Sequence, residues 1–329
     1  MKSWWIRTLE GGMAVEMRDV PEPSPGPEQI AVRLHAASLN RGEFIAGHGL
    51  HAANGPARPA GFEGAGEVIA VGSKVGVQPG MPKVGDRVMG RCDGAFAEQG
   101  CMMAEEVFPV PPSLDWEHAA CATLVYGTAH DMLIAQGRLA AGEWLLVTGI
   151  SSGVGVASLQ VAKALGAKVI GTSGSAAKLA RLKEMNLDLG LETRAPDFVP
   201  AVMEATGGRG ADLAVNNVGG SMFAACVEAL GFEGRLATVG YVDGIVKAEM
   251  DLMALHKKRL HLFGVSNKMR TVAHRVAAAR EFTRDLLPLL ESGRLRPIVD
   301  RVFDFDRLEA AKESMVRGDH LGKIVLRIR

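Results

Sequence analysis

The feature that most constrains the fold is the stretch LLVTGISSGVGVA, residues 145–157. An apolar run ends at Gly149, two serines follow, and Gly153 and Gly155 then open a segment with helical spacing. A strand, a glycine turn and a helix N-terminus bring backbone N–H groups and the positive end of a helix dipole to one point. The stretch therefore predicts a pyrophosphate site. Its spacing departs from a strict G-x-G-x-x-G. Taken alone, the stretch could therefore also be an ordinary strand-to-helix turn without a ligand.

From Glu143 to Ser266, apolar strands alternate with helical segments, which predicts a parallel sheet covered by helices on both faces. The expected strands read WLLVT, AKVIGTS, ADLAVNNVG, GRLATVG and LHLFGVS. The expected helices read VGVASLQVAKALG, SAAKLARLKEM and SMFAACVEAL. We expect Gly166 to end the first helix and Ser175 to cap the second.

The chain before residue 120 is expected to be rich in β-structure, with short strands at QIAVRLHAASLN, GAGEVIAVGS and VGDRVMGR. After Ser266 come the helical segments VAHRVAAAREFTRDLLPLLESG and RLEAAKESMVRG, and then a closing strand, GKIVLRI. Because this last strand has no partner in the parallel pattern, we expect it to return to the first domain. The predicted fold is α/β, with a discontinuous β-rich domain (1–122 and 267–329) around a dinucleotide-binding domain (123–266).

Composition excludes several classes of partner. The 37 basic and 37 acidic residues cancel, so no charge excess favours nucleic acid or an anionic membrane. The N-terminus shows no signal peptide, and no apolar run is long enough for a membrane span. The four cysteines form no C-x-x-C pair and do not resemble a disulfide framework. We therefore expect a cytoplasmic protein with a small-molecule substrate.

The end of the second parallel strand bears on the choice of dinucleotide. NAD sites usually carry an acid there for the ribose 2′-hydroxyl, but this strand continues as VIGTSGSAAK. Ser173 and Lys178 offer a hydroxyl and a cation, which suit a 2′-phosphate, and Arg194 is a further candidate cation. The sequence therefore favours NADPH. The alternative for Lys178 is that it is a solvent-exposed helix residue without a role in binding.

Several stretches together cover nearly the whole chain and carry a resemblance: AASLNRGEF, GFEGAGEVIAVG, VGDRVMG, AACATLVYGTAHDML, the 145–183 segment, GRLATVG and the tail from GRLRPIVD to GKIVL. Through them the chain resembles the medium-chain dehydrogenase/reductase superfamily, in its zinc-free NADPH:quinone oxidoreductase-like branch. The resemblance implies a GroES-like catalytic domain interrupted by a Rossmann domain, with the active site in the cleft between them. It also implies a homodimer, and the strand at residues 261–266 is a candidate for the pairing edge.

Zinc is not expected. Zinc-dependent relatives have a cysteine in the loop matched here by SLNRGEF and a histidine immediately before the glutamate matched by Glu63. This chain has Leu39 and Asn40 in the first region and Phe62 at the histidine position. Catalytic zinc needs about three protein ligands, and two of the expected ones are missing.

The resemblance places Asn40 near the nicotinamide and the substrate, where its amide would donate to a carbonyl or quinone oxygen or to the cofactor ribose. Tyr126 would protonate or orient the product. The alternatives are a turn-stabilising asparagine and a buried aromatic residue. Phe44 and Phe62 are expected to shape an apolar substrate pocket. Glu43 stands where many relatives have aspartate, so either a proton relay or a surface glutamate is possible there.

The expected cofactor contacts lie mainly at the glycine turn and at strand ends. Lys323 matches a loop that reaches the cofactor in relatives, with a surface charge as the alternative. Ser152 replaces a glycine that is common in relatives, and Thr193 stands where many have a tyrosine near the 2′-phosphate. The full set is Thr128, Ser152, Gly153, Val154, Gly155, Ser173, Lys178, Arg194, Asn217, Gly240, Tyr241, Val265, Asn267 and Lys323.

The predicted function is a metal-free, NADPH-dependent reductase that transfers hydride to quinones or other activated carbonyl or enone acceptors. Without a Lewis acid to polarise an alcohol, reduction of an already electrophilic acceptor is the feasible chemistry. One alternative is a carbon–carbon double-bond reductase for 2-alkenals or enones. Another is a non-catalytic NADPH-binding protein.

Overall fold

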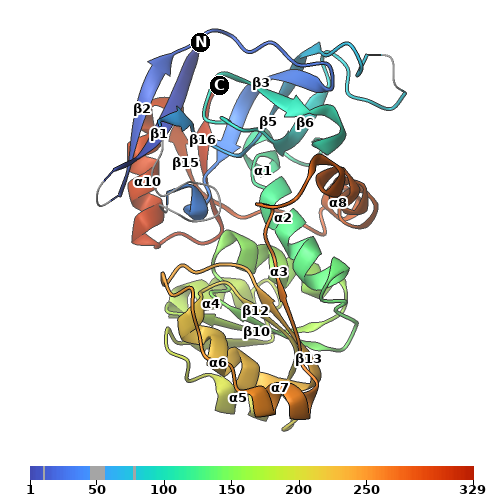
Figure 1. The fold of residues 1–329 in the computed structure, drawn as a ribbon, viewed down its shortest axis with the longest axis vertical. Coiled ribbons are helices and arrows are strands. Elements are labelled where there is room, and N and C mark those ends of the chain that lie inside the picture. The colour runs from blue at the N-terminus through green and yellow to red at the C-terminus, as the bar shows by residue number, and fades with distance from the viewer. Residues whose placement is uncertain (10–11, 45–55, 77–78) are drawn as a thin grey trace. The chain divides into compact units, whose positions relative to one another are not determined.

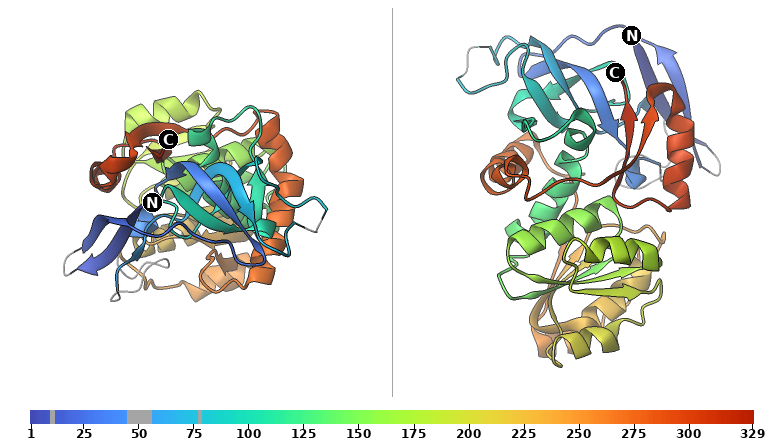
Figure 2. Two further views of the ribbon diagram at one scale, coloured as in Figure 1. Left: turned by 90° about the horizontal axis from the view of Figure 1, so that it is seen from above. Right: turned by 180° about the vertical axis from the view of Figure 1, so that it is seen from behind.

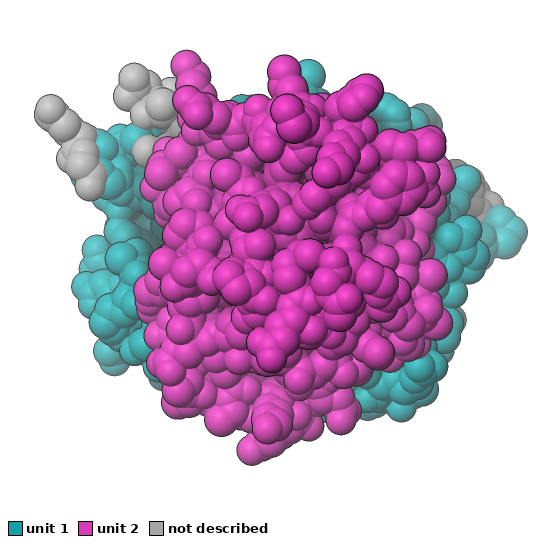
Figure 3. Space-filling model, turned by 90° about the horizontal axis from the view of Figure 1, so that it is seen from below, with its two compact units in different colours: residues 1–127, 268–329 teal, residues 128–267 magenta. Residues whose placement is uncertain are grey.

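A computed structural model describes residues 1–9, 12–44, 56–76 and 79–329. The chain divides into two compact units. Unit 1 comprises residues 1–127 and 268–329, and unit 2 comprises residues 128–267 (Figure 3). The sequence placed these boundaries at 122/123 and 266/267.

Unit 2 is built on a six-stranded parallel sheet, ordered β11-β10-β9-β12-β13-β14 in space. The order along the chain is therefore 3-2-1-4-5-6, the doubly wound pattern that reverses between β9 and β12. This confirms the predicted fold class. The strands are β9 (Trp144–Thr148), β10 (Lys168–Ser173), β11 (Leu189–Glu192), β12 (Ala211–Asn216), β13 (Leu230–Thr238) and β14 (His261–Gly264).

Helices cover both faces of this sheet, with α3 and α4 on one face and α5, α6 and α7 on the other (Figures 1 and 2). The central strands β9 and β12 are buried on both sides, which agrees with their apolar runs WLLV and LAV. As predicted, Ser175 caps α4, because its hydroxyl accepts from the Lys178 N–H at 3.4 Å. The helices are α3 (Gly153–Ala164), α4 (Ala176–Lys183), α5 (Val199–Ala205), α6 (Gly220–Ala229) and α7 (Leu252–Lys258), with a π-helical turn, η3 (Asp131–Ala135).

Unit 1 contains two sheets. The larger is ordered β15-β16-β3-β5-β6-β8, with β7 also paired to β3, and the smaller is β2-β1-β4. The closing strand β16 pairs antiparallel with β3, which is the return that the sequence predicted. The sequence did not locate β1 and β2. The strands are β1 (Lys2–Leu9), β2 (Gly12–Asp19), β3 (Gln29–Ser38), β4 (Arg58–Pro59), β5 (Glu63–Val71), β6 (Arg87–Arg91), β7 (Gln99–Met103), β8 (Val107–Pro109), β15 (Val299–Asp304) and β16 (Lys323–Arg327).

Two helices of unit 1, α1 (Trp116–Ala119) and α10 (Leu308–Arg317), pack against strands of its larger sheet. The segment 272–293, expected to be one helix, forms two, because Pro288 lies in the first turn of α9 and cannot continue the hydrogen bonding of α8. The helices and turns are η1 (Arg41–Phe44), η2 (Ala104–Glu106), α1 (Trp116–Ala119), α2 (Thr123–His130), α8 (Val272–Asp285), α9 (Leu287–Glu291), η4 (Phe305–Arg307) and α10 (Leu308–Arg317). None of the helices in the described part of the chain combines the length and apolar character that a membrane span needs.

Candidate functional site

The glycine turn after β9 is tightly closed. Gly149 has a φ of +64°, and a methyl group on Gly155 would lie 2.5 Å from the Ile150 carbonyl oxygen, so both positions require glycine. The Ser152 hydroxyl accepts from the Gly155 N–H at 3.1 Å and caps α3. Ser152 therefore starts the helix as well as fitting the turn, which the sequence analysis did not foresee.

The start of α3 retains backbone donors. The Gly153 and Val154 N–H groups have no intrahelical partner, and no acceptor for them is found among the described residues. Together with the helix dipole they make an anion site of the kind that holds a pyrophosphate. The turn also binds the neighbouring strand, since the Gly149 N–H donates to Thr172 Oγ1 at 3.2 Å.

The other cofactor candidates of unit 2 follow strands and so lie at the carboxyl-end edge of its sheet. Asn217 follows β12, and its side-chain amide donates to the Thr148 carbonyl at 3.0 Å, which joins the ends of β12 and β9. The backbone N–H of Val265 donates to the Thr238 carbonyl. Gly240 and Tyr241 follow β13, Asn267 follows β14, and the ring of Tyr241 is exposed. Ligands of doubly wound sheets bind at this edge.

The end of β10 is covered by Arg194. The side chain of Arg194 lies so close to Gly174 that a methyl group there would be 2.1 Å from its Nε. Arg194 is an exposed residue, and Ser173, which precedes Gly174, donates to Ser151 Oγ at 3.2 Å. The structure thus brings a cation to the strand end that lacks an acid. Lys178, one turn into α4, is partly buried.

Unit 1 contains a buried polar cluster centred on Glu63, the first residue of β5. One of its carboxylate oxygens accepts from Ser38 at 2.6 Å and from Lys323 at 2.9 Å. The other accepts from the Thr123 hydroxyl at 3.0 Å and from the Leu124 N–H at 2.8 Å. Although burial alone would raise the pKa of Glu63, Lys323 and these donors lower it below its ordinary value. Glu63 is therefore an ionised, fully partnered carboxylate.

Asn40 belongs to the same cluster. Its Nδ2 donates to Glu43 at 2.9 Å and to Glu63 at 3.2 Å, and its Oδ1 accepts from Lys323 at 2.5 Å. Both amide hydrogens are thus committed to carboxylates. The donation to a substrate oxygen or a cofactor ribose expected for Asn40 does not fit this arrangement.

Lys323, expected to contact the cofactor or to be a surface charge, is 4% exposed at the start of β16. Its ammonium binds Glu63 and Asn40, so the role as a surface charge is wrong. A buried carboxylate needs such a partner, and the strand that supplies it arrives from the far end of the chain. The contact between Lys323 and the cofactor stays a prediction. Its ammonium is already bound to Glu63 and Asn40 inside unit 1.

Glu43 is the member of the cluster that the sequence left open between a relay and a surface residue. It is 1% exposed, which excludes the surface role. One of its oxygens accepts from Asn40, and the other, Oε2, is buried without a hydrogen-bond partner among the described residues. Burial raises the pKa of Glu43 to about 8.

Tyr126 lies in α2 and is 1% exposed. Burial, and next the nearby Cys121, raise the pKa of its hydroxyl well above the ordinary value, so the phenol holds its proton more tightly. Its proposed role in protonating the product stays a prediction. Phe44 and Phe62 are partly buried neighbours of Glu43 and Glu63.

Thr128, also expected to contact the cofactor, is partly buried in α2 and is the first residue of unit 2. The four cysteines are free thiols, and burial raises the pKa of Cys121. Across the described ranges, no three His, Cys, Asp or Glu side chains gather as metal ligands would.

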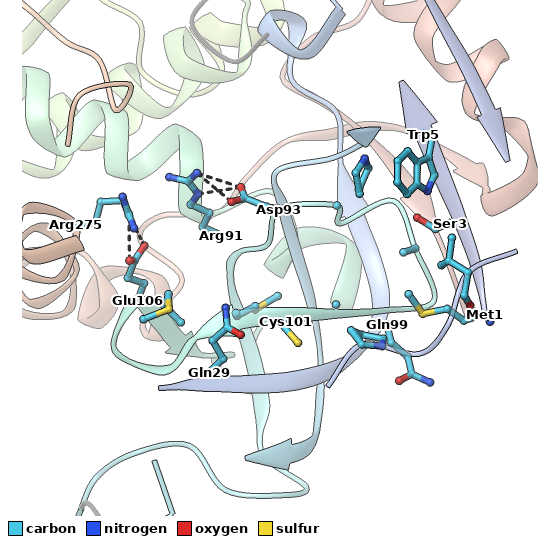
Figure 4. Close-up of a pocket in the computed structure, with 18 residues that line it drawn as sticks. Met1, Ser3, Trp5, Gln29, Arg91, Asp93, Gln99, Cys101, Glu106 and Arg275 are labelled. Carbon is cyan, nitrogen blue, oxygen red and sulfur yellow. Dashed lines mark hydrogen bonds and ion pairs between the residues drawn. The ribbon is translucent and has the colours of Figure 1, made fainter. Parts of the chain in front are cut away.

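A separate cavity of about 330 Å³ lies in unit 1 (Figure 4). It is lined by β1, β3, β7 and the segment that follows β6. The two arginines at its wall form ion pairs, Arg91 with Asp93 and Arg275 with Glu106. None of the predicted site residues lines it.

Two family models match the chain. An alcohol dehydrogenase GroES-like domain matches residues 26–112, and a zinc-binding dehydrogenase domain matches residues 153–283. The chain is 31% identical over 317 residues to part of a phenolphthiocerol/phthiocerol polyketide synthase of Mycobacterium tuberculosis. That match covers 96% of this chain and 14% of the synthase polypeptide, so the chain spans about a seventh of that relative.

Solved structures match over the full length. The quinone oxidoreductase of Thermus thermophilus, solved alone and with NADPH, has a TM-score of 0.82 and 27% identity, with both chains fully covered. A mycobacterial protein solved in complex with NADPH has a TM-score of 0.86 and 26% identity, again with both chains fully covered. The doubly wound sheet of unit 2, the GroES-like model match in unit 1 and these structural matches all indicate the same superfamily. The chain belongs to the medium-chain dehydrogenase/reductase superfamily.

Proposed function

We propose that this protein is an NADPH-dependent, metal-free reductase that transfers hydride to quinones or other activated carbonyl or enone acceptors. The observation that carries the proposal is the end of β10 in unit 2, where Arg194 covers Gly174 and the strand itself ends without an acid. The carboxylate of Glu192, on the adjacent β11, accepts from the Ala176 N–H at 3.1 Å. A cation at this position favours a 2′-phosphate, whereas NAD sites usually carry an acid there. Two of the solved structures that the chain resembles are described with NADPH.

The residues of unit 2 fit this cofactor. The Gly153 and Val154 N–H groups would hold the pyrophosphate, and the glycine at position 155 leaves room for the turn that presents them. Arg194, Ser173 and Lys178 would hold the 2′-phosphate. Residues at the ends of β12, β13 and β14 would line the nicotinamide and its ribose. Bound NADPH would supply the hydride.

Metal-free chemistry is proposed from the donor set. Leu39 and Asn40 stand in the loop where zinc-dependent relatives carry a cysteine, and Phe62 stands at the position of their histidine, so neither a thiolate nor an imidazole is available there. The glutamate that follows Phe62 is fully occupied by Lys323, Ser38 and Thr123. Since no zinc would polarise an alcohol, the acceptor must already be electrophilic.

The remaining assignments concern the acceptor. Phe44 and Phe62 would form its apolar contacts, and Tyr126 would orient it. Asn40 would act by holding the η1 turn, because its amide is already hydrogen-bonded to carboxylates. We also propose that the protein is a cytoplasmic homodimer paired through the edge strand β14.

A carbon–carbon double-bond reductase is the second candidate. It is favoured by the polyketide synthase match, which covers 96% of this chain. The hydride step is the same in both candidates, and only the acceptor differs.

The test is acceptor-dependent oxidation of NADPH, followed by absorbance on chelator-treated protein, with a panel of quinones, enones and 2-alkenals. NADH is run in parallel. Turnover that prefers NADPH and survives chelation supports the proposal, and the best acceptor decides between quinone and double-bond reduction. Loss of activity on chelation contradicts the metal-free assignment. Tight NADPH binding without any turnover favours a non-catalytic binding protein.

A further inference from the structure

The cluster in unit 1 contains two buried carboxyl groups and one ammonium. Glu43 and Glu63 are each 1% exposed, and Lys323 is 4% exposed. Lys323 binds Glu63 directly at 2.9 Å, whereas Glu43 is reached only through the Asn40 amide. If both glutamates were ionised, the cluster would hold an uncompensated buried negative charge, which is costly.

The hydrogen bonds distinguish the two glutamates. Glu63 accepts from Ser38, Asn40, Lys323, Thr123 and the Leu124 N–H. Glu43 accepts only from Asn40 among the described residues, and its Oε2 has no partner there. A carboxylate with one donor, whose nearby cation Lys323 is bound to another carboxylate, is far less stabilised than one with five donors. The excess proton therefore belongs on Glu43, on the oxygen that no donor occupies.

The other charged groups packed around the η1 turn do not change this balance. Arg41, on the same turn, donates to the Met315 carbonyl. Helix α10 packs against the turn and carries Glu309, Lys312, Glu313 and Arg317. Of these, Lys312 donates to the Met13 carbonyl and Arg317 pairs with Asp319.

The location of Glu43 gives its proton a structural role. Its backbone N–H and its carboxyl group both bind Asn40, at 3.0 Å and 2.9 Å, so it closes the η1 turn. Asn40 then connects this turn to Glu63, and hence to β5. Phe44 follows Glu43 and Phe62 precedes Glu63, so the network fixes the backbone on which both proposed acceptor contacts stand.

We propose that Glu43 is held as a neutral carboxylic acid and that this neutral form positions the η1 turn against β5 for acceptor binding. Glu43 is thus a positioning residue that acts through Asn40, and the assignment rests on the proposed function. Loss of its proton leaves a second buried anion facing Glu63. Although the Asn40 amide binds an anionic acceptor more strongly, the repulsion between the two carboxylates and the cost of burying the new charge loosen the turn. The Michaelis constant for the acceptor then rises, while NADPH binding in unit 2 does not change.

The test compares wild type with Glu43→Gln, which imitates the neutral acid, and with Glu106→Gln. Glu106 is a suitable control because it is also a buried glutamate of unit 1, but an ion-paired one. Three quantities are followed from about pH 6 to about pH 10. They are the carboxylic-acid C=O stretch in the infrared difference spectrum of the NADPH-free protein, the thermal unfolding midpoint, and kcat/KM for the acceptor.

In wild type we expect a carboxylic-acid band that disappears as the pH rises through about 8, together with a fall in kcat/KM of about tenfold per pH unit above that value. The fall should come from KM and not from kcat. Glu43→Gln should lack the band, keep the wild-type KM of neutral pH, and remove the pH dependence, whereas Glu106→Gln should keep it. Glu43→Ala, which leaves one hydrogen of the Asn40 amide without its acceptor, should raise KM at every pH.

The proposal is overturned if Glu43→Gln leaves the band in place, if its pH profiles run parallel to those of wild type, or if it abolishes turnover as loss of a proton donor would. An inactive wild-type protein would refute the proposed function and not the protonation of Glu43. The infrared band and the unfolding midpoint would then still decide the inference, the band supporting it when present and refuting it when absent.

Discussion

Replacing Lys323 by methionine tests whether the polar cluster of unit 1 is held by its buried cation. The ammonium lies 2.9 Å from Glu63 and 2.5 Å from Asn40, and both partners of the ion pair are almost fully buried. Removing one partner of a buried pair costs about 3–5 kcal/mol, because the other charge is left uncompensated. Glu63 keeps donors from Ser38, Thr123 and Leu124, so we expect a cost of about 3 kcal/mol.

The assay is urea-induced unfolding followed by tryptophan fluorescence, which reports mainly on unit 1 because Trp4, Trp5 and Trp116 lie there. The matched control is Lys74→Met, which removes an exposed ion pair with the same 2.9 Å separation and should change stability little. The double variant Lys323→Met, Glu63→Gln should cost clearly less than the sum of the two single variants, since no buried charge is left alone. If Lys323→Met and Lys74→Met have equal effects, the buried cation is not what holds the cluster.

Three further variants address the other parts of the site. Because the pKa of Glu43 is raised from 4.5 to about 8, the stability that it contributes is present below pH 4.5 and is lost as the pH rises toward 8. Each pH unit of this difference corresponds to about 1.4 kcal/mol, so Glu43→Gln should stabilise the protein by about 3 kcal/mol at pH 7 and should have no effect near pH 4. Urea unfolding measures both values, and equal effects at the two pH values would refute this prediction. Gly155→Ala should weaken NADPH binding about tenfold or more in a fluorescence titration, because its methyl group would meet Ile150 backbone atoms. Gly12→Ala, in unit 1 and with open space around the new methyl group, is the control and should have no effect. Arg194→Ala should raise the KM for NADPH about tenfold and leave the KM for NADH unchanged. The control is Arg209→Ala, which lies before β12 at the opposite edge of the sheet. An equal rise in KM for both cofactors would argue against a contact between Arg194 and the 2′-phosphate.

The parallel sheet of unit 2 was predictable because its central strands are continuous apolar runs. The helices α5 and α7 were not identified, and α5 has no side-chain cap at its N-terminus. The strand β11, residues 189–192, was not identified either. It is an edge strand of only four residues that alternate between exposed and partly buried, and it contains a glycine, so it has neither an apolar run nor β-branched residues. The helix break at Pro288 was visible in the sequence, but the apolar spacing continues across it.

Only some members of the polar cluster of unit 1 were predictable, and Ser38 and Thr123 were not among them. Asn40 and Lys323 were identified through the family resemblance, but their contact spans 283 residues of chain and leaves no local pattern. The same is true of the pair formed by Lys323 and Glu63, which are 260 residues apart. Whether a lysine is a surface charge or a buried counter-ion depends on which strands pair, and here the antiparallel pairing of β16 with β3 decides it.

The pairing of β16 with β3 also means that unit 2 can fold during synthesis before unit 1 is complete. The residues of unit 2 are all translated before residue 268, so its sheet has every strand while unit 1 still lacks β15 and β16. Until Lys323 leaves the ribosome, Glu63 has no cation, and a native-like burial of two carboxyl groups beside Asn40 is unfavourable. The first part of unit 1 must therefore remain loosely packed until β16 has been synthesised. Chains that terminate early would then expose an unfinished β-sheet beside a finished Rossmann unit, which makes them targets for chaperones and proteases.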